Sequence, residues 1–323
     1  MVYTHLTEGE RYQIYALHRQ GAYQKEIAEQ LGRAPATISR ELRRNRGKRG
    51  YRAKQAQRKA TARRVCNARR IAPQTWAWAE ERLAERWSPE QIGGRAKREG
   101  RPTLSHESIY RRIYADKRAG GTLWKCLRCQ KKRRKRYASG RERRGQIVDR
   151  RPIEERPAIV DEKGRLGDWE GDLVIGAQQR HALVSVVERR TQYLVLRKIT
   201  SKAASEVSQA MIEGLAPLRA CLMSITLDNG KEFAHFKAVD SALDTTTYFA
   251  RPYHSWERGL NEQTNGKLRD YYPKKMPFDE LTQHDCDRVA EAMNSRPRKS
   301  LGYRTPKEEL SILATEQKIA LHL

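Results

Sequence analysis

Almost all of the excess positive charge in this chain lies in its first 150 residues. The sequence has 323 residues, with 66 Lys and Arg against 39 Asp and Glu. Residues 1–150 hold 40 of the basic and 14 of the acidic side chains, whereas residues 151–323 hold 26 and 25. Neutralising phosphates releases condensed counterions, so a strongly basic half favours a nucleic-acid partner over a merely solvated basic surface. The length suggests about two domains, and the near-neutral second half needs a different task.

Several protein classes are disfavoured by the composition. No stretch approaches the roughly 18 apolar residues of a membrane span, and residues 1–20 carry no apolar signal-peptide core. Five cysteines are too few for a disulfide framework. We therefore expect a cytoplasmic, DNA-associated protein with no membrane partner.

Residues 1–50 carry the spacing of a helix-turn-helix DNA-binding domain. Thr7 and Glu10 fit a capping box that starts a helix. Small Ala28, turn-forming Gly32 and apolar Ile38 then follow at the intervals of that motif, although an ordinary three-helix bundle is the alternative. The side chains expected to face outward on the last helix are assigned to DNA contact: Thr37, Ser39, Arg40, Arg43 and Arg44.

Residues 51–125 predict a basic helix and a second helix-turn-helix-like unit. The segment Ser88–Gln91 repeats a helix-start signature, with a capping hydroxyl, a proline in the first turn and Gln at the third position. A later helix places Ile109 and Ile113 inward and leaves Arg111 and Arg112 for DNA. A helical hairpin that only packs against the first motif is the alternative.

Residues 126–155 predict a basic linker. Lys131–Arg136 is an unbroken run of six basic residues, in which no core can form. Cys126 and Cys129 form one C-x-x-C pair just before it. Structural zinc needs four ligands, and no second pair or nearby histidine cluster is present, so we expect two plain thiols.

Residues 156–323 predict a single domain that contains both strands and helices. The expected strands are Leu166–Ile175, Ala182–Val187, Tyr193–Ile199, Met223–Leu227 and Thr245–Ala250. Helical patterns follow the third strand and each later strand, over Ser201–Leu218, Glu232–Leu243, Glu257–Tyr271 and His284–Asn294. This order combines antiparallel hairpins with helical crossovers. It therefore predicts a mixed five-stranded sheet with helices on both faces, and an α+β chain overall, because the first half is all-α.

Three acids occupy places where this fold can bring them together. Asp172 lies in the first expected strand, Asp228 ends the fourth, and Glu262 lies on a helix. If the first and fourth strands are neighbours, two carboxylates stand at adjacent strand positions. Carboxylate oxygens suit Mg²⁺, and two such ions about 4 Å apart can clamp both oxygens of a phosphodiester displacement. The three acids are therefore the candidate catalytic and metal-binding residues.

Several short sequence motifs resemble those of a known protein family. They are W-E-G-D (Trp169–Asp172), L-D-N-G-K-E-F (Leu227–Phe233), R-G-L-N-E-Q-T-N-G (Arg258–Gly266), Y-Y-P-K (Tyr271–Lys274) and N-S-R-P-R-K (Asn294–Lys299). Together with L-T-E-G-E-R and I-S-R-E-L-R-R-N near the start, they are similar to the insertion-sequence-thirty family of DDE transposases. Between Asp228 and Glu262 lie 33 residues, as the DD(33)E pattern of that family requires.

The resemblance implies a ribonuclease-H-like fold for residues 156–323 and metal-dependent DNA cleavage and strand transfer at terminal inverted repeats. It also implies two Mg²⁺ or Mn²⁺ ions per site, double-stranded repeat and target DNA as partners, and a homo-oligomer, at least a dimer, in a bacterial cell. Asp168, Glu170 and Asp172 share one strand face, and Asp172 is the position that matches the motif.

Further residues near these motifs are assigned supporting roles. Asn265 lies on roughly the same helix face as Glu262 and is expected to orient that glutamate or to touch DNA. Arg269 and Lys274 are expected to contact phosphates, with an ordinary surface ion pair as the alternative for Arg269. The other supporting residues are Asn229 and Asn261.

Two other functions remain open on the residues alone. One is a helix-turn-helix regulator with a non-catalytic second domain, and the other is a different integrase-type nuclease. The acid set separates the first from a transposase, because a regulator has no need for three acids at this spacing. The two helix-turn-helix units expected in residues 1–125 argue against a plain ribonuclease, because a ribonuclease need not bind a particular end sequence.

Overall fold

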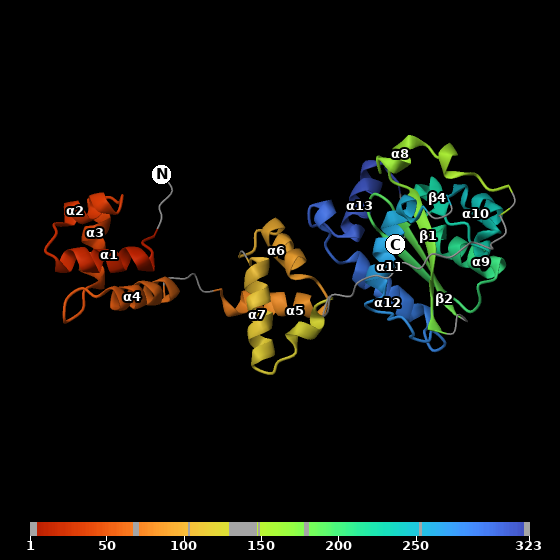
Figure 1. The fold of residues 1–323 in the computed structure, drawn as a ribbon. Coiled ribbons are helices and arrows are strands. Elements are labelled where there is room, and N and C mark those ends of the chain that lie inside the picture. Colours follow the sequence, from red (N-terminus) through yellow and green to blue (C-terminus); the bar gives the residue numbers. More distant parts are fainter. Residues whose placement is uncertain are drawn as a thin grey trace. The chain divides into compact units, whose positions relative to one another are not determined.

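The computed structural model describes residues 5–66, 71–102, 104–128, 147, 149–177, 181–251 and 254–319. It divides into two compact units, Met1–Ala72 and Pro73–Leu323, which are described separately (Figure 1). Among the described residues, no helix has the length and apolar character needed to cross a bilayer.

The first unit is a helical domain with its own core. As predicted, Thr7 and Glu10 form a reciprocal capping box at its first helix. Ile14, Ile27 and Ile38, from three different helices, are completely buried together. Its helices are α1 (Glu8–Arg19), α2 (Gln24–Gln30), α3 (Pro35–Asn45) and α4 (Ala53–Cys66).

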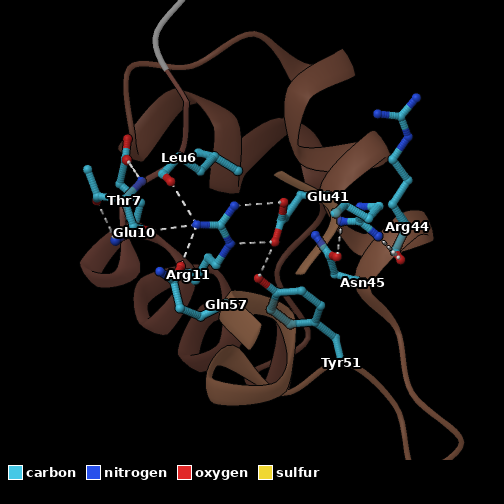
Figure 2. Close-up of polar contacts among 10 residues, drawn as sticks. Leu6, Thr7, Glu10, Arg11, Glu41, Arg44, Asn45, Tyr51 and Gln57 are labelled. Atoms are coloured by element: carbon cyan, nitrogen blue, oxygen red, sulfur yellow. Dashed lines mark hydrogen bonds and ion pairs between the residues drawn. The ribbon is translucent and has the colours of Figure 1, made fainter. Parts of the chain in front are cut away.

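A buried polar network ties the helices of this first unit together (Figure 2). The Arg11 guanidinium donates to Glu41 Oε1 at 2.9 Å and to the Leu6 carbonyl at 2.7 Å. It also donates to Gln57 Oε1 at 2.7 Å, and the Tyr51 hydroxyl donates to Glu41 Oε1 at 3.2 Å. The side chains of Arg11 and Glu41 are 7% and 8% exposed, so the ion pair links α1 to α3 inside the core. No pattern in the sequence predicts this network, because its members are far apart in the chain.

The second unit begins with three helices, of which the second and third lie where the sequence predicts them. Ser88 caps the second of them and forms a capping box with Gln91, and Ser105 caps the third. Arg95 reaches from this segment to Glu308 near the end of the chain, with nitrogen–oxygen distances of 2.6 and 2.7 Å. The segment therefore packs on the C-terminal part of its own unit. Its elements are α5 (Pro73–Ala84), α6 (Pro89–Arg98), α7 (His106–Arg118) and η1 (Leu123–Cys126).

A mixed five-stranded sheet forms the rest of the second unit, and its strand order is β3-β2-β1-β4-β5. The β1–β2 and β2–β3 pairs are antiparallel, whereas β1–β4 and β4–β5 are parallel. The first and fourth strands are neighbours, which is the condition under which the sequence places Asp172 and Asp228 at adjacent strand positions. The strands are β1 (Asp168–Ile175), β2 (Ala182–Glu188), β3 (Leu194–Ile199), β4 (Ser224–Leu227) and β5 (Thr246–Phe249).

Helices cover both faces of this sheet, as predicted (Figure 1). One core joins the sheet to α9 (Ala204–Leu215), α10 (Phe236–Leu243) and α13 (Pro306–Glu316). The other joins it to α11 (Gly259–Leu268) and α12 (Gln283–Asn294). The short helices are α8 (Ala158–Asp161), η2 (Ile153–Glu155), η4 (Ala216–Cys221), η5 (Lys231–Phe233), η6 (Ser255–Arg258) and η7 (Lys299–Leu301).

Three predicted helices are shorter than expected, and one of them, expected over Glu257–Tyr271, is α-helical only over Gly259–Leu268. The helix expected over Ser201–Leu218 ends at Leu215, and the chain continues as the 3-10 helix η4, which contains Pro217. Proline lacks an amide donor and clashes with the preceding turn, so it ends the α-helical pattern. The helix expected from Glu232 begins at Phe236, after the one-turn η5.

Candidate active site

Asp172 and Asp228 lie at one edge of the sheet because β1 and β4 run parallel. Glu170 pairs with Thr226, and continuing this register by two residues brings Asp172 level with Asp228. Their side chains are 27% and 31% exposed. A Cβ added at Gly171 would lie 2.4 Å from Cδ2 of Leu227, so the Leu227 side chain would have to shift to admit a larger residue beside Asp172.

Arg258 places one positive charge between the two aspartates. Its guanidinium lies 3.6 Å from Asp172 Oδ1 and 3.3 Å from Asp228 Oδ2, and it donates to the Gly171 carbonyl at 3.2 Å. Burial raises the pKa of Asp172, the charge of Arg258 opposes that rise, and the charge of Asp228 adds to it. Arg258 lies inside the R-G-L-N-E-Q-T-N-G motif, but the sequence alone predicted no role for this arginine.

Asn265 fixes the orientation of Asp172. Its Nδ2 donates to Asp172 Oδ2 at 2.7 Å, and the Ser185 hydroxyl donates to Asn265 Oδ1 at 2.9 Å. We expected Asn265 to orient Glu262 or to contact DNA. The structure turns its side chain toward the sheet, whereas the Glu262 side chain is exposed.

The structure brings two of the three candidate acids together. Among the described residues, no three His, Cys, Asp or Glu side chains are close enough to share a metal ion, so Glu262 is not gathered with Asp172 and Asp228. The two aspartates nevertheless hold a cation, the Arg258 guanidinium, between them. Carboxylate oxygens are also the donors that Mg²⁺ prefers, so this pair fits a divalent ion.

The other two acids on the same face of β1 have partners in the fold. Asp168 is completely buried and accepts from Arg165 Nε at 2.9 Å and from the Ser224 hydroxyl at 2.6 Å. Glu170, 1% exposed, pairs with Arg189 and accepts from the Asn261 backbone amide at 3.0 Å. Glu170 thus anchors the first turn of α11 on the sheet.

The remaining supporting residues lie close to these acids. Asp228 Oδ1 accepts from the Gly230 amide at 3.0 Å, which fixes the turn after β4. Asn229 accepts from Arg150 and donates to the Ala250 carbonyl. Asn261 is completely buried, and its side-chain amide has no hydrogen-bond partner among the residues that the structure describes.

The residues assigned to DNA contact differ in their surroundings. On α3, the side chains of Ser39, Arg40, Arg43 and Arg44 are exposed and Thr37 is half-buried. On α7, Arg111 and Arg112 are exposed, and Arg112 pairs with Glu80 at 2.9 Å. Lys274 is exposed.

The Arg269 side chain forms a hydrogen bond within the fold. Its guanidinium donates to the carbonyl of Ile175 at 3.1 Å, and burial lowers its pKa. Cys126 carries a free thiol, whereas Cys129 and the run Lys131–Arg136 lie outside the described residues.

Comparisons with known proteins identify a domain family and several full-length relatives. A helix-turn-helix domain family matches residues 2–45. The transposase for insertion sequence element IS4351 of Bacteroides fragilis is 39% identical over 320 residues, 98% of each chain. Transposase InsI for IS30C of Escherichia coli K12 is 36% identical over 317 residues, 94% of this chain and 82% of the relative.

Further relatives extend the comparison. The transposase for IS1086 of Cupriavidus metallidurans is 36% identical over 321 residues, 96% of this chain and 95% of the relative. Among solved structures, the catalytic core domain of BIV integrase is 20% identical, with a TM-score of 0.37 over 46% of this chain and 97% of that chain. The full-length matches at more than 30% identity determine the assignment: the chain belongs to the IS30 family of insertion-sequence transposases.

Proposed function

We propose that this transposase binds the terminal inverted repeats of its insertion sequence and cuts and joins DNA with Asp172, Asp228 and Glu262 around two divalent ions, Mg²⁺ or Mn²⁺. The observation that carries the proposal is the pair of aspartates at the β1–β4 edge with one cation between them. Glu262 is assigned as the third ligand by its place in the motif and on α11, the helix that Arg258 precedes. Bound ions would activate an attacking hydroxyl and stabilise the departing oxygen.

The contribution of the protein is to hold these carboxylates in position. Asn265 fixes one oxygen of Asp172, and the Gly230 amide fixes one oxygen of Asp228. Glu170 secures the start of α11 through the Asn261 amide, so the helix that carries Glu262 is attached to the strand that carries Asp172. Such preorganisation stabilises developing charge without reorganising at the moment of reaction.

The exposed basic side chains of α3 favour this helix as the reader of the terminal repeats. Arg111, Arg112 and Lys274 are assigned to further DNA contacts. Because an insertion sequence has two inverted repeats, we assign at least a dimer of this chain to the DNA-bound state. Light scattering of the complex with a terminal-repeat duplex would measure that mass, and a complex with one protein chain would contradict it.

The catalytic assignment is tested by isosteric substitutions. Asp172→Asn, Asp228→Asn and Glu262→Gln keep side-chain volume and remove the charge that a divalent ion needs. Each should lower cleavage of a labelled terminal-repeat duplex in Mg²⁺ at least about 100-fold and leave binding of the duplex unchanged. A double variant should lose little more than a single one, because residues of one catalytic unit are not additive.

Two exposed acids of the same unit serve as matched controls, Asp287→Asn and Glu280→Gln. Both controls should cleave at the wild-type rate. Full activity of Glu262→Gln would remove this glutamate from the mechanism. Loss of duplex binding in all three site variants would favour the alternative function, a helix-turn-helix regulator with a non-catalytic second domain. In such a protein the three acids would only stabilise the fold.

A further inference from the structure

A strongly basic cavity of about 740 Å³ lies within the second unit, between the α5–α7 segment and the C-terminal part. Its lining includes one acid, Glu107, which is exposed. Six of the residues that line it carry positive charge: Arg86, Arg111, Arg128, Lys267, Arg296 and Arg298. None of these six belongs to the carboxylate site described above.

Two of the arginines that line this cavity are buried. Arg296 and Arg298 are 5% and 6% exposed. Arg296 donates to the Tyr271 hydroxyl at 2.6 Å, and Arg298 donates to the Met293 carbonyl at 3.0 Å. The Nε atom of each is buried and has no hydrogen-bond partner, and neither side chain forms an ion pair with an acid of the described residues. Burying an unpaired charge costs free energy, which an anion in the cavity would offset.

Lys267 brings a third positive charge to the same place from α11. Among the described residues, its ammonium donates only to the neutral Gln263 side chain, at 3.1 Å. Burial, followed by the charges of Arg298, Arg128 and Arg296, lowers its pKa to about 7. Burial and the neighbouring charge of Arg296 likewise lower the pKa of Arg298, to about 10. The cluster therefore consists of cations that repel one another.

The nearby acid Asp270 is already engaged by two arginines. Its carboxylate pairs with Arg128 at 2.9 Å, and its backbone carbonyl accepts from Arg86 at 2.7 Å. Arg128 also lies against α11, since a Cβ at Gly266 would stand 3.4 Å from Arg128 Nη2. Asp270 thus balances Arg128, and its charge also acts on Arg296, whereas no acid of the described residues forms an ion pair with Lys267 or Arg298.

These features together identify a ligand class. Several guanidinium groups and an ammonium around one space suit a phosphate, whose oxygens each accept charge-assisted hydrogen bonds. Tyr110 and Tyr114 of α7, stacked with ring centroids 6.2 Å apart, also line the cavity and are partly exposed. Aromatic rings beside a phosphate site suit a nucleic-acid strand, because bases stack on them.

We propose that this cavity binds a backbone phosphate of the DNA on which the transposase acts. Lys267 follows Glu262 by five residues on α11, about 7.5 Å along the helix axis. The cavity is therefore lined in part by the same helix that carries Glu262. The proposal rests on the proposed function only in taking DNA as the ligand, and its test measures binding, independently of cleavage and of end recognition.

The test uses the full chain and two probes, inorganic phosphate and a random-sequence DNA duplex. The variants are Lys267→Gln and, on the exposed side of the cavity, Arg111→Gln, which disturbs no buried contact. The control is Arg219→Gln, which removes an equal charge from an exposed position outside the cavity. Thermal unfolding in chloride of matched ionic strength shows whether each variant is folded before any binding is compared.

Inorganic phosphate should raise the melting temperature of the wild type and of Arg219→Gln, and should raise that of Lys267→Gln less. The slope of log affinity for the duplex against log salt concentration should become shallower by about 1 in Lys267→Gln and in Arg111→Gln, and stay unchanged in Arg219→Gln. Phosphate stabilisation without any change of slope would assign the cavity to a free anion and overturn the DNA proposal. Absence of both effects would overturn the anion site itself.

Discussion

Arg258 is the only cation that contacts both Asp172 and Asp228 among the described residues. With the guanidinium present, the two carboxylates share one counter-charge at a partly buried edge. Without it, two like charges would face each other, which costs free energy and raises the pKa of Asp172 further. A substitution of Arg258 therefore tests whether this edge of the sheet binds a divalent ion.

We predict that Arg258→Gln lowers the stability of the metal-free protein by about 1–3 kcal/mol, the usual value of a hydrogen bond to a charged group. Mn²⁺ should then restore stability, because a divalent ion replaces the lost positive charge between the aspartates. The measurement is the melting temperature in EDTA and in Mn²⁺, with Arg219→Gln as the control. An equal Mn²⁺-induced rise in wild type and variant would show that no ion takes this position.

The acids of β1 show how far single residues are predictable from sequence. Strand alternation places Asp168, Glu170 and Asp172 on one face, since the pattern repeats every two residues. Alternation alone does not distinguish the roles of the three acids. Their different roles come from residues far away in the chain: Ser224 for Asp168 and Arg189 for Glu170. The family motif selected Asp172 by position, and the structure adds that it is the only one of the three that is not fully buried.

At the scale of elements, capping residues correctly predicted where helices start, whereas contacts between residues far apart in the chain could not be predicted. The capping residues Thr7, Ser88 and Ser105 mark helix starts because the side-chain acceptor and the free amides lie within one turn. The contact between Arg95 and Glu308 joins residues 213 positions apart, and no periodicity in the sequence encodes it. The attachment of α6 to α13 therefore had to come from the structure.

We predict that Glu308→Gln loosens this attachment and does not disturb the start of α13. Glutamine at this position retains the capping box with Thr305, so the loss is confined to the charge that pairs with Arg95. The Glu308 side chain is 40% exposed, so solvent screens the pair and we expect a loss of no more than about 1 kcal/mol at pH 7.

The pH dependence of that loss follows from the pKa of Glu308. The hydrogen bond from Arg95 lowers this pKa from 4.5 to about 2. The stabilisation is therefore complete above about pH 4.5 and disappears as the pH falls toward 2. The melting temperatures of wild type and Glu308→Gln should differ at pH 7 and converge in acid. Glu316→Gln, at the exposed end of the same helix, should match the wild type throughout. A difference that persists unchanged into acid would contradict the role of this charge.

At the scale of the whole molecule, positive charge is present in both units. Residues 1–72 contain 18 basic and 5 acidic side chains, and residues 73–323 contain 48 and 34. Both units therefore have charge for binding phosphates. The feature special to the first unit is a separate core, closed by Ile14, Ile27 and Ile38 and by the Arg11–Glu41 pair. A domain with its own core can present the exposed side chains of α3 independently of the rest of the chain.

We predict that a fragment of residues 1–72 unfolds cooperatively by itself and binds a terminal-repeat duplex in preference to a random duplex. Arg40→Gln in this fragment should weaken the preference by about 1–3 kcal/mol if the arginine contacts a base edge, whereas Arg19→Gln, at the exposed end of α1, should leave it unchanged. The complementary fragment, residues 73–323, should discriminate between the two duplexes less than residues 1–72 do, because it lacks α3, the helix assigned to recognise the repeat. Mobility-shift titrations at several salt concentrations measure both properties. Specific recognition of the repeat by residues 73–323 alone would place the end reader in the second unit and leave the exposed face of α3 without its assigned role.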